Sequence, residues 1–126
     1  MTHTPAHAVI WTELPVRDLP AAMAFYSAVF GYALETTEMG PNPVAVLPTA
    51  DGKGVAGHLY PGTPAGDGSG PTVHLVVPGP LAEAMDRCTA AGGRVISPPI
   101  EIPEGTFAYA TDPDGNSLGL FEPRAA

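Results

Sequence analysis

Two short apolar segments of the sequence each carry one ionisable side chain, and together these side chains could bind a ligand or do chemistry. The segments are IWTELPV at residues 10–16, which contains Glu13, and TVHLVV at residues 72–77, which contains His74. An acid that faces an imidazole can form a structural ion pair, hold a polar group of a ligand, or act as general base and general acid. All three roles need the two side chains to face each other.

The segment around Glu13 has the alternation of a β-strand, in which successive side chains point to opposite faces. Trp11, Glu13 and Pro15 therefore share one face. The opposite face carries Ile10, Thr12, Leu14 and Val16. We interpret the second face as core and the face with Trp11 and Glu13 as the lining of a cavity.

A helical pattern follows each of these two strands. Residues 19–30 place apolar side chains at helical spacing, with Asp18 as the N-cap and Gly31 as a left-handed cap at the end. Residues 80–91 predict a second helix. The two halves match at an offset of 61 for Val16 and Val77, and of 62 for Met23 and Met85 and for Gly31 and Gly93.

Three short β-like runs follow each predicted helix. The first set lies near residues 33–39, 42–48 and 54–60, and the second near 94–98, 105–111 and 117–122. The chain therefore predicts an α+β fold of two β-α-β-β-β modules in tandem, forming a single domain over residues 1–126. The predicted parts are a first module at about 7–61, a Gly- and Pro-rich linker at 62–70, and a second module at about 71–124.

This duplicated pattern resembles the vicinal oxygen chelate superfamily, which includes glyoxalase I, bleomycin resistance proteins and extradiol dioxygenases. The segments that carry the resemblance are LPVRDLPAAMAFYSAVFGY in the first module and DPDGNSLGLFEP in the second. The resemblance implies that each module folds its sheet into a half-open cup. It also implies that paired modules enclose a ligand cavity, either within one chain or between two.

The resemblance also implies where a metal ion would bind, namely on the first and last strand of each module. The corresponding residues are Trp11, Thr72, Gly119 and either Gly57 or Ala56, depending on how the first module is aligned. Glycine and alanine offer no donor atom, and an indole N–H cannot coordinate a metal. We therefore expect the fold without the metal site, and no cofactor. A divalent ion held by Glu13, His74 and His58 is the disfavoured alternative.

We expect the ligand site to lie on the faces that the two first strands share. Glu13 and His74 correspond at the offset of 61, so in a duplicated cup they would face each other across the cavity. They are the two candidates for a catalytic role. The ligand-binding residues that we predict are Trp11, Glu13, Thr72, His74, Phe107 and Tyr109.

The other histidines give weaker indications. His58 faces the helix side if the halves are aligned at an offset of 62, and the cavity if their turns are aligned. His3 and His7 lie in a polar N-terminal tail, which disfavours a metal cluster built on them.

Two segments of the second half have a structural and a functional interpretation each. Cys88 lies among apolar helix positions, as a small buried hydrophobe does. The segment PPIEIPEG, with Glu101 and Glu104, is predicted to be a Pro-rich loop that is either solvated or closes over the cavity mouth.

The composition narrows the choice of partners. The 126 residues carry a formal charge of -8, with five Lys and Arg against thirteen Asp and Glu, so nucleic acid and anionic membranes are poor partners. The one cysteine cannot form an internal disulfide, which suits a reducing compartment. No signal peptide and no apolar run of about 18 residues is evident, so we expect a soluble cytoplasmic protein.

Several functions fit these observations. We favour a metal-free protein that binds a small molecule. The alternatives are a metal-dependent glyoxalase-like lyase, isomerase or dioxygenase with unusual ligands, a metal-free acid–base enzyme that uses Glu13 and His74, and a non-catalytic module with a vestigial cavity. We also expect a homodimer, because an isolated cup leaves strand edges and an apolar face exposed.

Overall fold

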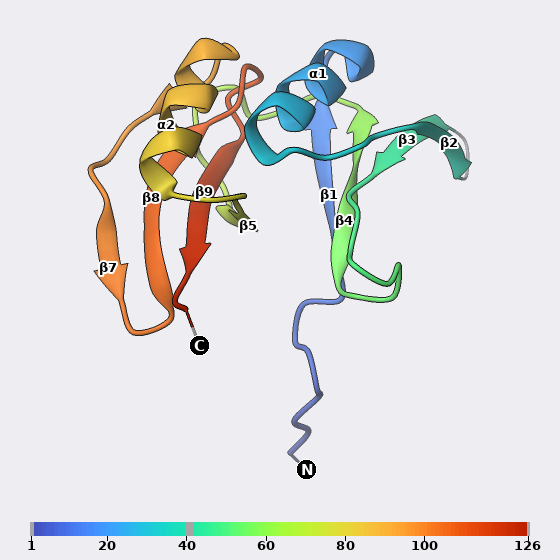
Figure 1. The fold of residues 1–126 in the computed structure, drawn as a ribbon. Helices are drawn as coiled ribbons and strands as arrows, with labels where there is room; N and C mark the ends of the chain where they lie inside the picture. Colours follow the sequence, from blue (N-terminus) through green and yellow to red (C-terminus); the bar gives the residue numbers. More distant parts are fainter. Residues whose placement is uncertain (1, 40–41, 126) are drawn as a thin grey trace.

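The computed structural model describes residues 2–39 and 42–125, and Figure 1 shows them as two modules side by side. The first module contains β1 (Trp11–Val16), α1 (Leu19–Phe30), β2 (Thr36–Met39), β3 (Asn42–Val46) and β4 (Ala56–Pro61). The second contains β5 (Val73–Val76), α2 (Leu81–Ala90), β6 (Arg94–Val95), β7 (Ile100–Ile102), β8 (Gly105–Thr111) and β9 (Ser117–Pro123). The predicted α+β architecture of two tandem β-α-β-β-β units is confirmed.

The two modules share one sheet topology. The strand order is β1-β4-β3-β2 in the first sheet, called sheet A, and β5-β9-β8-β6 in the second, called sheet B. In each sheet the first strand of the module runs parallel to the last, and the other pairs are antiparallel. The two first strands, β1 and β5, therefore lie at sheet edges, each with one edge that no other described strand covers.

Both helices cover the same side of their sheets and pack against each other (Figure 1). Helix α1 begins at Asp18, whose carboxylate accepts the N–H of Ala21 at 3.0 Å, and ends at Gly31 in the left-handed conformation. Its buried side meets Leu14 and Val16 of β1. Neither helix is long and apolar enough to span a bilayer, and no other helix occurs in the described residues.

A polar turn in the second module fastens the two modules together. Asp112, at the start of the sequence DPDGN, accepts the hydroxyl of Tyr26 from α1 at 2.8 Å. The side-chain amide of Asn116 donates to the carbonyl of Pro15 in β1 at 2.8 Å, and Arg17 contacts Asp114 at 3.2 Å. These contacts join residues about a hundred positions apart in the chain and hold β1 beside the second module.

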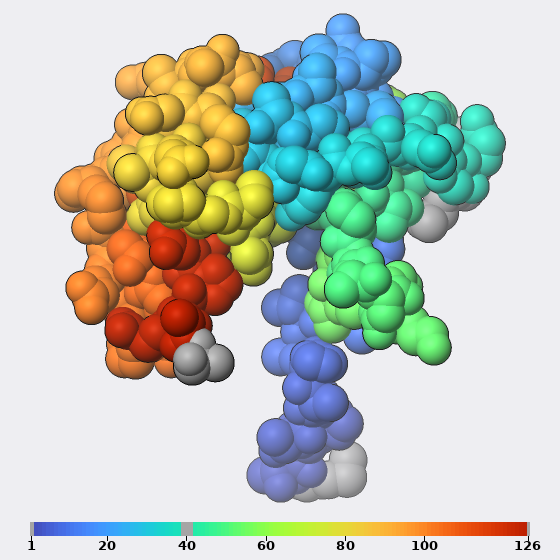
Figure 2. Space-filling model, viewed as in Figure 1, coloured from blue at the N-terminus to red at the C-terminus, as the bar shows by residue number. Residues whose placement is uncertain are grey.

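Away from this junction the modules separate. Figure 2 shows the surface hollowed below the helices, between the first module and the strands of sheet B. The N-terminal residues that precede β1 extend away from the body of the molecule in Figure 1. Val9 and Ile10, just before β1, are 62% and 72% exposed.

The pairing registers decide which residues share a face. In sheet A, Glu13 lies opposite His58, and in sheet B, His74 lies opposite Gly119. His58 of the first module is thus the counterpart of Gly119 in the second. The sequence had suggested Gly57 or Ala56 as that counterpart. His58 lies on the face of Glu13, away from the helix, as the turn-aligned interpretation required.

One predicted loop is wrong. Ile100–Ile102, in the middle of PPIEIPEG, forms β7 and pairs with β8. Glu101 points into an exposed ion pair with Arg124 at 3.5 Å. The segment is therefore part of sheet B, neither a solvated loop nor a flap over a cavity, because its two isoleucines lie opposite Phe107 and Gly105 of β8.

Candidate functional site

A cleft of about 1000 Å³ lies between the two modules. One wall is strand β5 with its flanking residues, from Pro71 to Pro78. The facing wall comes from the end of α1, from β1 and β4, and from the loop between β3 and β4, and includes Phe30, Tyr32, Thr12, Leu47, Val55 and Ala56. Most of these side chains are apolar, so the cleft suits an organic molecule more than a bare ion.

His74 brings an imidazole to the cleft wall, which also carries the phenol of Tyr32. The ring of His74 lies over Gly119 of the neighbouring strand, where a Cβ atom would overlap the imidazole. The ring contacts three aromatic side chains of β8 and β9, with ring centroids 4.9 Å from Phe107 and 6.0 Å from both Tyr109 and Phe121. Burial lowers the pKa of His74 below its ordinary value. The imidazole is therefore favoured in its neutral form.

A second group of polar side chains lies on sheet A. The indole N–H of Trp11 donates to Nδ1 of His58 at 2.9 Å, and Nε2 of His58 lies 3.3 Å from a carboxylate oxygen of Glu13. We call these three residues the Trp11–His58–Glu13 trio. They meet because Glu13 pairs with His58 across two parallel strands, and Trp11 precedes Glu13 by two residues on the same face.

The hydrogen bond from Trp11 determines which nitrogen of His58 carries the proton. An indole N–H can only donate, so Nδ1 of His58 must offer its lone pair. In a neutral imidazole the proton is then on Nε2, the nitrogen that lies 3.3 Å from the carboxylate of Glu13. The contact between His58 and Glu13 therefore joins a neutral ring to a carboxylate.

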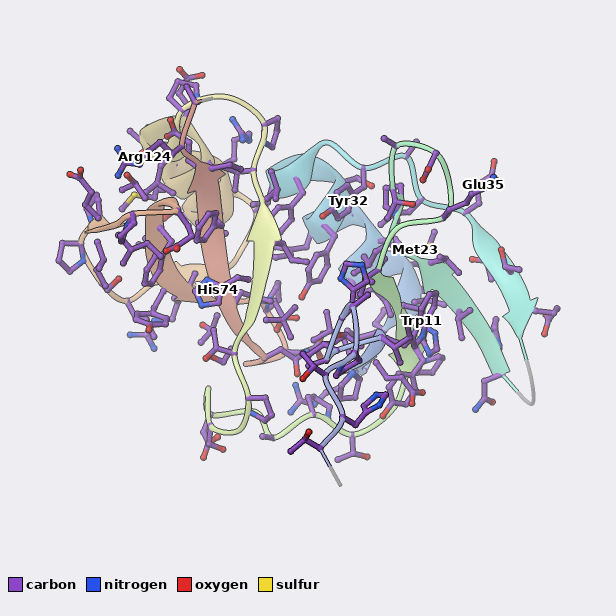
Figure 3. The ribbon with its side chains drawn as sticks, turned by 90° about the horizontal axis from the view of Figure 1, so that it is seen from below. Trp11, Met23, Tyr32, Glu35, His74 and Arg124 are labelled. Carbon is purple, nitrogen blue, oxygen red and sulfur yellow. The ribbon has the colours of Figure 1, made fainter. Side chains whose placement is uncertain are left out.

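The predicted site residues fall into these two groups. Thr72 and His74 line the cleft, and Phe107 and Tyr109 pack beside His74 on the same face of sheet B. Trp11 and Glu13 belong to sheet A, and the carboxylate of Glu13 contacts His58 rather than His74. In Figure 3, Trp11 and His74 lie on separate modules, with β5 and the space around Tyr32 between them.

Sequence reasoning missed two contributors, Phe121 and Tyr32, and left the role of His58 open. Phe121 completes the aromatic surroundings of His74, and its position two residues after Gly119 in a strand could have indicated that. Tyr32 follows the cap of α1 and lines the cleft. The contacts of His58 with Trp11 and Glu13 depend on a register that the sequence left open.

The positions where the resemblance places metal ligands do not fit a metal ion. Trp11 offers only an N–H, which His58 accepts. Both ring nitrogens of His58 are engaged, the hydroxyl of Thr72 is bonded to Ser117 at 2.5 Å, and Gly119 has no side chain. Among residues 2–39 and 42–125, no group of three or more His, Cys, Asp or Glu is arranged to hold a metal ion.

Cys88 and the N-terminal histidines stand apart from both groups. Cys88 is fully buried in the core, as predicted, and burial raises the pKa of its thiol to about 11. His3 and His7 lie in the exposed N-terminal tail.

Comparison with known proteins agrees with the fold. A protein named as a glyoxylase, CFP32 from Mycobacterium tuberculosis, is 29% identical over 116 residues, which are 89% of this chain and 44% of that protein. The chain thus spans less than half of the length of this curated relative.

Solved structures show the same architecture over most of their length. TnmS3 from Streptomyces sp. CB03234, an antibiotic binding protein, has a TM-score of 0.62 and 25% identity, covering 97% of this chain and 100% of that one. The fosfomycin resistance protein FosX from Listeria monocytogenes has a TM-score of 0.65 at 18% identity, covering 100% and 95%.

The family is settled by the sequence itself. The sequence model of the Glyoxalase/Bleomycin resistance protein/Dioxygenase superfamily matches residues 6–120, which is nearly the whole chain. The match includes residues of both modules and the linker between them. The chain therefore belongs to the Glyoxalase/Bleomycin resistance protein/Dioxygenase superfamily.

Proposed function

We propose that this protein binds a small organic molecule in the cleft between its modules, without using a metal ion. The observation that carries the proposal is the cleft itself, because about 1000 Å³ lined mainly by apolar side chains matches the pockets of organic ligands. His74 adds one polar group to this wall, which could orient a ligand by a hydrogen bond.

Two further observations support binding over metal-dependent turnover. The donor atoms at the four family positions do not fit a metal ion, and so provide no basis for polarising a bound substrate. The similar structure TnmS3 is an antibiotic binding protein, so binding alone is a function found on this fold. We extend that function to this chain as part of the proposal.

We propose that the protein works as a homodimer in which β1 of one chain lies beside β5 of the other. Both strands have a free edge among the described strands, and apolar side chains beside those edges are exposed: Val9, Ile10 and Trp11 at β1, and Val76 at β5. Uncovered edges of this kind favour pairing. Glu13 would then face His74 of the partner subunit across one shared cavity, which is one of the two ways of pairing the modules that the sequence left open.

A ligand search on the purified protein tests the binding proposal. Native mass spectrometry should find a co-purified molecule, or a fragment screen by ligand-observed NMR should find binders, with metal content measured on the same sample. Val55→Trp, which fills the cleft from its loop, should abolish binding. Ala82→Trp, on the exposed side of α2, is the matched control and should leave binding unchanged.

Three results would contradict these proposals. Binding that Val55→Trp leaves intact would place the ligand elsewhere. A stoichiometric divalent metal that the binding requires would overturn the metal-free mode. A sedimentation mass near 12.9 kDa at micromolar concentration would overturn the homodimer.

A further inference from the structure

The Trp11–His58–Glu13 trio is built in a way that neither a packing role nor a metal site requires. Its members are joined by one hydrogen bond and one close polar contact, yet two of them remain accessible: the side chain of Glu13 is 64% exposed and Trp11 is 41% exposed. Core residues bury such side chains, and a metal site would leave a ring nitrogen of His58 free. The trio instead presents a fixed carboxylate and a fixed indole to the space outside sheet A.

We infer that the trio is the anchor for a positively charged, hydrogen-bond-donating group on a flat aromatic ligand. This inference rests on the proposed function and names the chemical class of its ligand. The trio does not itself line the cleft, but it lies next to one end of it, because Ala56, which pairs with Trp11 across the strands, lines the cleft wall.

The charge of the anchor follows from the bonds of the trio. His58 is neutral when it accepts the indole N–H, so the negative charge of Glu13 is not cancelled within the trio. One carboxylate oxygen of Glu13 lies 3.3 Å from Nε2 of His58, and the other has no hydrogen-bond partner among the described residues. That free oxygen is a preoriented acceptor, which favours a charged donor over a neutral one.

The indole adds a second feature with the same preference. The faces of tryptophan rings attract cations more strongly than those of other aromatic residues. Two residues along a strand span about 7 Å, so a ring stacked on Trp11 could carry an amino group that reaches Glu13. Because the bond to His58 fixes the indole edge, the ring face stays in a defined orientation beside the carboxylate.

The surrounding charges agree with this assignment. Arg17 is engaged with Asp114, Arg87 with the carbonyls of Val29 and Pro78, and Arg124 with Glu101. No Lys or Arg is hydrogen-bonded or ion-paired to the trio in the part of the chain that the structure describes. The formal charge of -8 further favours the approach of a cation over that of an anion.

Three acridines that share one ring system test the inference by isothermal titration calorimetry at pH 8. Proflavine is a planar cation with amino donors, acridine is neutral, and acridine-9-carboxylate is an anion. We expect the wild-type protein to bind proflavine most tightly. Glu13→Gln should weaken proflavine by about 10- to 100-fold, the loss expected for a hydrogen bond to a charged group, and should change acridine little.

Two further variants separate charge from ring contact. Glu101→Gln removes one exposed carboxylate on β7 and should leave proflavine binding unchanged. Trp11→Leu removes the ring face and should weaken both proflavine and acridine, with the larger loss for proflavine because the indole face also attracts its charge. Circular dichroism and thermal melts of each variant show that it is folded before it is titrated.

The outcomes distinguish this inference from the proposed function. Failure of proflavine to bind the wild-type protein, tighter binding of acridine-9-carboxylate, or unchanged proflavine affinity in Glu13→Gln would each overturn the cationic anchor. If one of these results is found, but neutral acridine still binds and Val55→Trp abolishes that binding, the proposed binding function would stand without the cationic anchor. Loss of proflavine affinity in Glu13→Gln alone, and not in Glu101→Gln, would support the inference.

Discussion

Gly119 leaves room for the ring of His74, and an alanine at this position should remove that room. The Cβ atom of alanine would overlap the imidazole, whereas the backbone of Gly119 is not in the left-handed region and accepts any residue. The strand can therefore stay in place while the imidazole turns out to solvent. Gly119→Ala should thus act through His74 and not through the backbone.

The size of the effect follows from the contacts of the ring. The edge-to-face pair of His74 with Phe107 has a favourable geometry and is worth about 1 kcal/mol, and the two rings at 6.0 Å add about 0.5 kcal/mol together. Replacing a strand glycine by alanine returns about 0.5–1 kcal/mol through the unfolded state. The net loss for Gly119→Ala should be about 0.5–1 kcal/mol.

A double-mutant cycle with His74→Ala measures this coupling by urea unfolding. Without the imidazole, Gly119→Ala has nothing to displace and should stabilise the protein by about 0.5–1 kcal/mol, which gives a coupling energy of about 1.5 kcal/mol. Effects that add within about 0.5 kcal/mol would refute the contact between His74 and Gly119.

The pH dependence provides a second readout of the same variant. Burial lowers the pKa of His74 in the folded state, so the unfolded chain takes up a proton first as the pH falls below about 6.5. The stability present above that pH is lost as the pH falls through the folded-state pKa. In Gly119→Ala the ring is solvated, and this dependence should disappear while NMR shows the pKa of His74 returning towards its ordinary value.

Three other predictions concern single side chains. Tyr26→Phe should cost about 1.5–3 kcal/mol in urea unfolding, because it removes a donor to the buried carboxylate of Asp112. Burial raises the pKa of Tyr26 well above 10.0, so the wild-type protein should also lose stability as the pH rises beyond 10.0, a loss that the variant should lack. Cys88, with a pKa of about 11, should react with a disulfide reagent at pH 8 only after unfolding, and fast labelling of the native protein would contradict its burial. Long-range proton–nitrogen NMR spectra should show His58 with its proton on Nε2, and a proton on Nδ1 would contradict the bond from Trp11.

The helices and the repeat could be predicted from the sequence because their signals are local. Asp18 and Gly31 mark the ends of α1, which runs from Leu19 to Phe30 as predicted. The second helix was expected at 80–91 and begins and ends one residue inside those limits. Caps and apolar spacing act within one turn of a helix, so a single sequence contains all of the relevant information.

β7 was missed because its signal is too short. Three residues of alternating apolar and acidic type, between two prolines, are no more typical of a strand than of a loop. Pro99 and Pro103 flank β7 and do not interrupt it, and Ile100 and Ile102 are held by pairing with β8. That pairing depends on a partner strand and not on the segment itself.

The register of β4 could not be predicted, and with it the Trp11–His58–Glu13 trio. The first strands match at an offset of 61 and the helices at 62, so the sequence left two counterparts of Gly119 open: Gly57 at the offset of 62, and Ala56 if the turns are aligned. The structure returns to 61, since Glu13 lies opposite His58 as His74 lies opposite Gly119. Compared with the first module, the second therefore has one extra residue before its helix α2 and one residue fewer between α2 and β9. The connections that contain these changes have no common sequence pattern.

This shift decides how the two modules use equivalent positions. In sheet A the pair is Glu13 and His58, and the imidazole comes from the last strand. In sheet B the pair is His74 and Gly119, and the imidazole comes from the first strand, filling the space that the glycine leaves. Each module therefore keeps one imidazole near its centre, but the first couples it to an acid and the second packs it among aromatic rings. A cavity that joined the two faces would have a charged end and an aromatic end, which suits a ligand with both features.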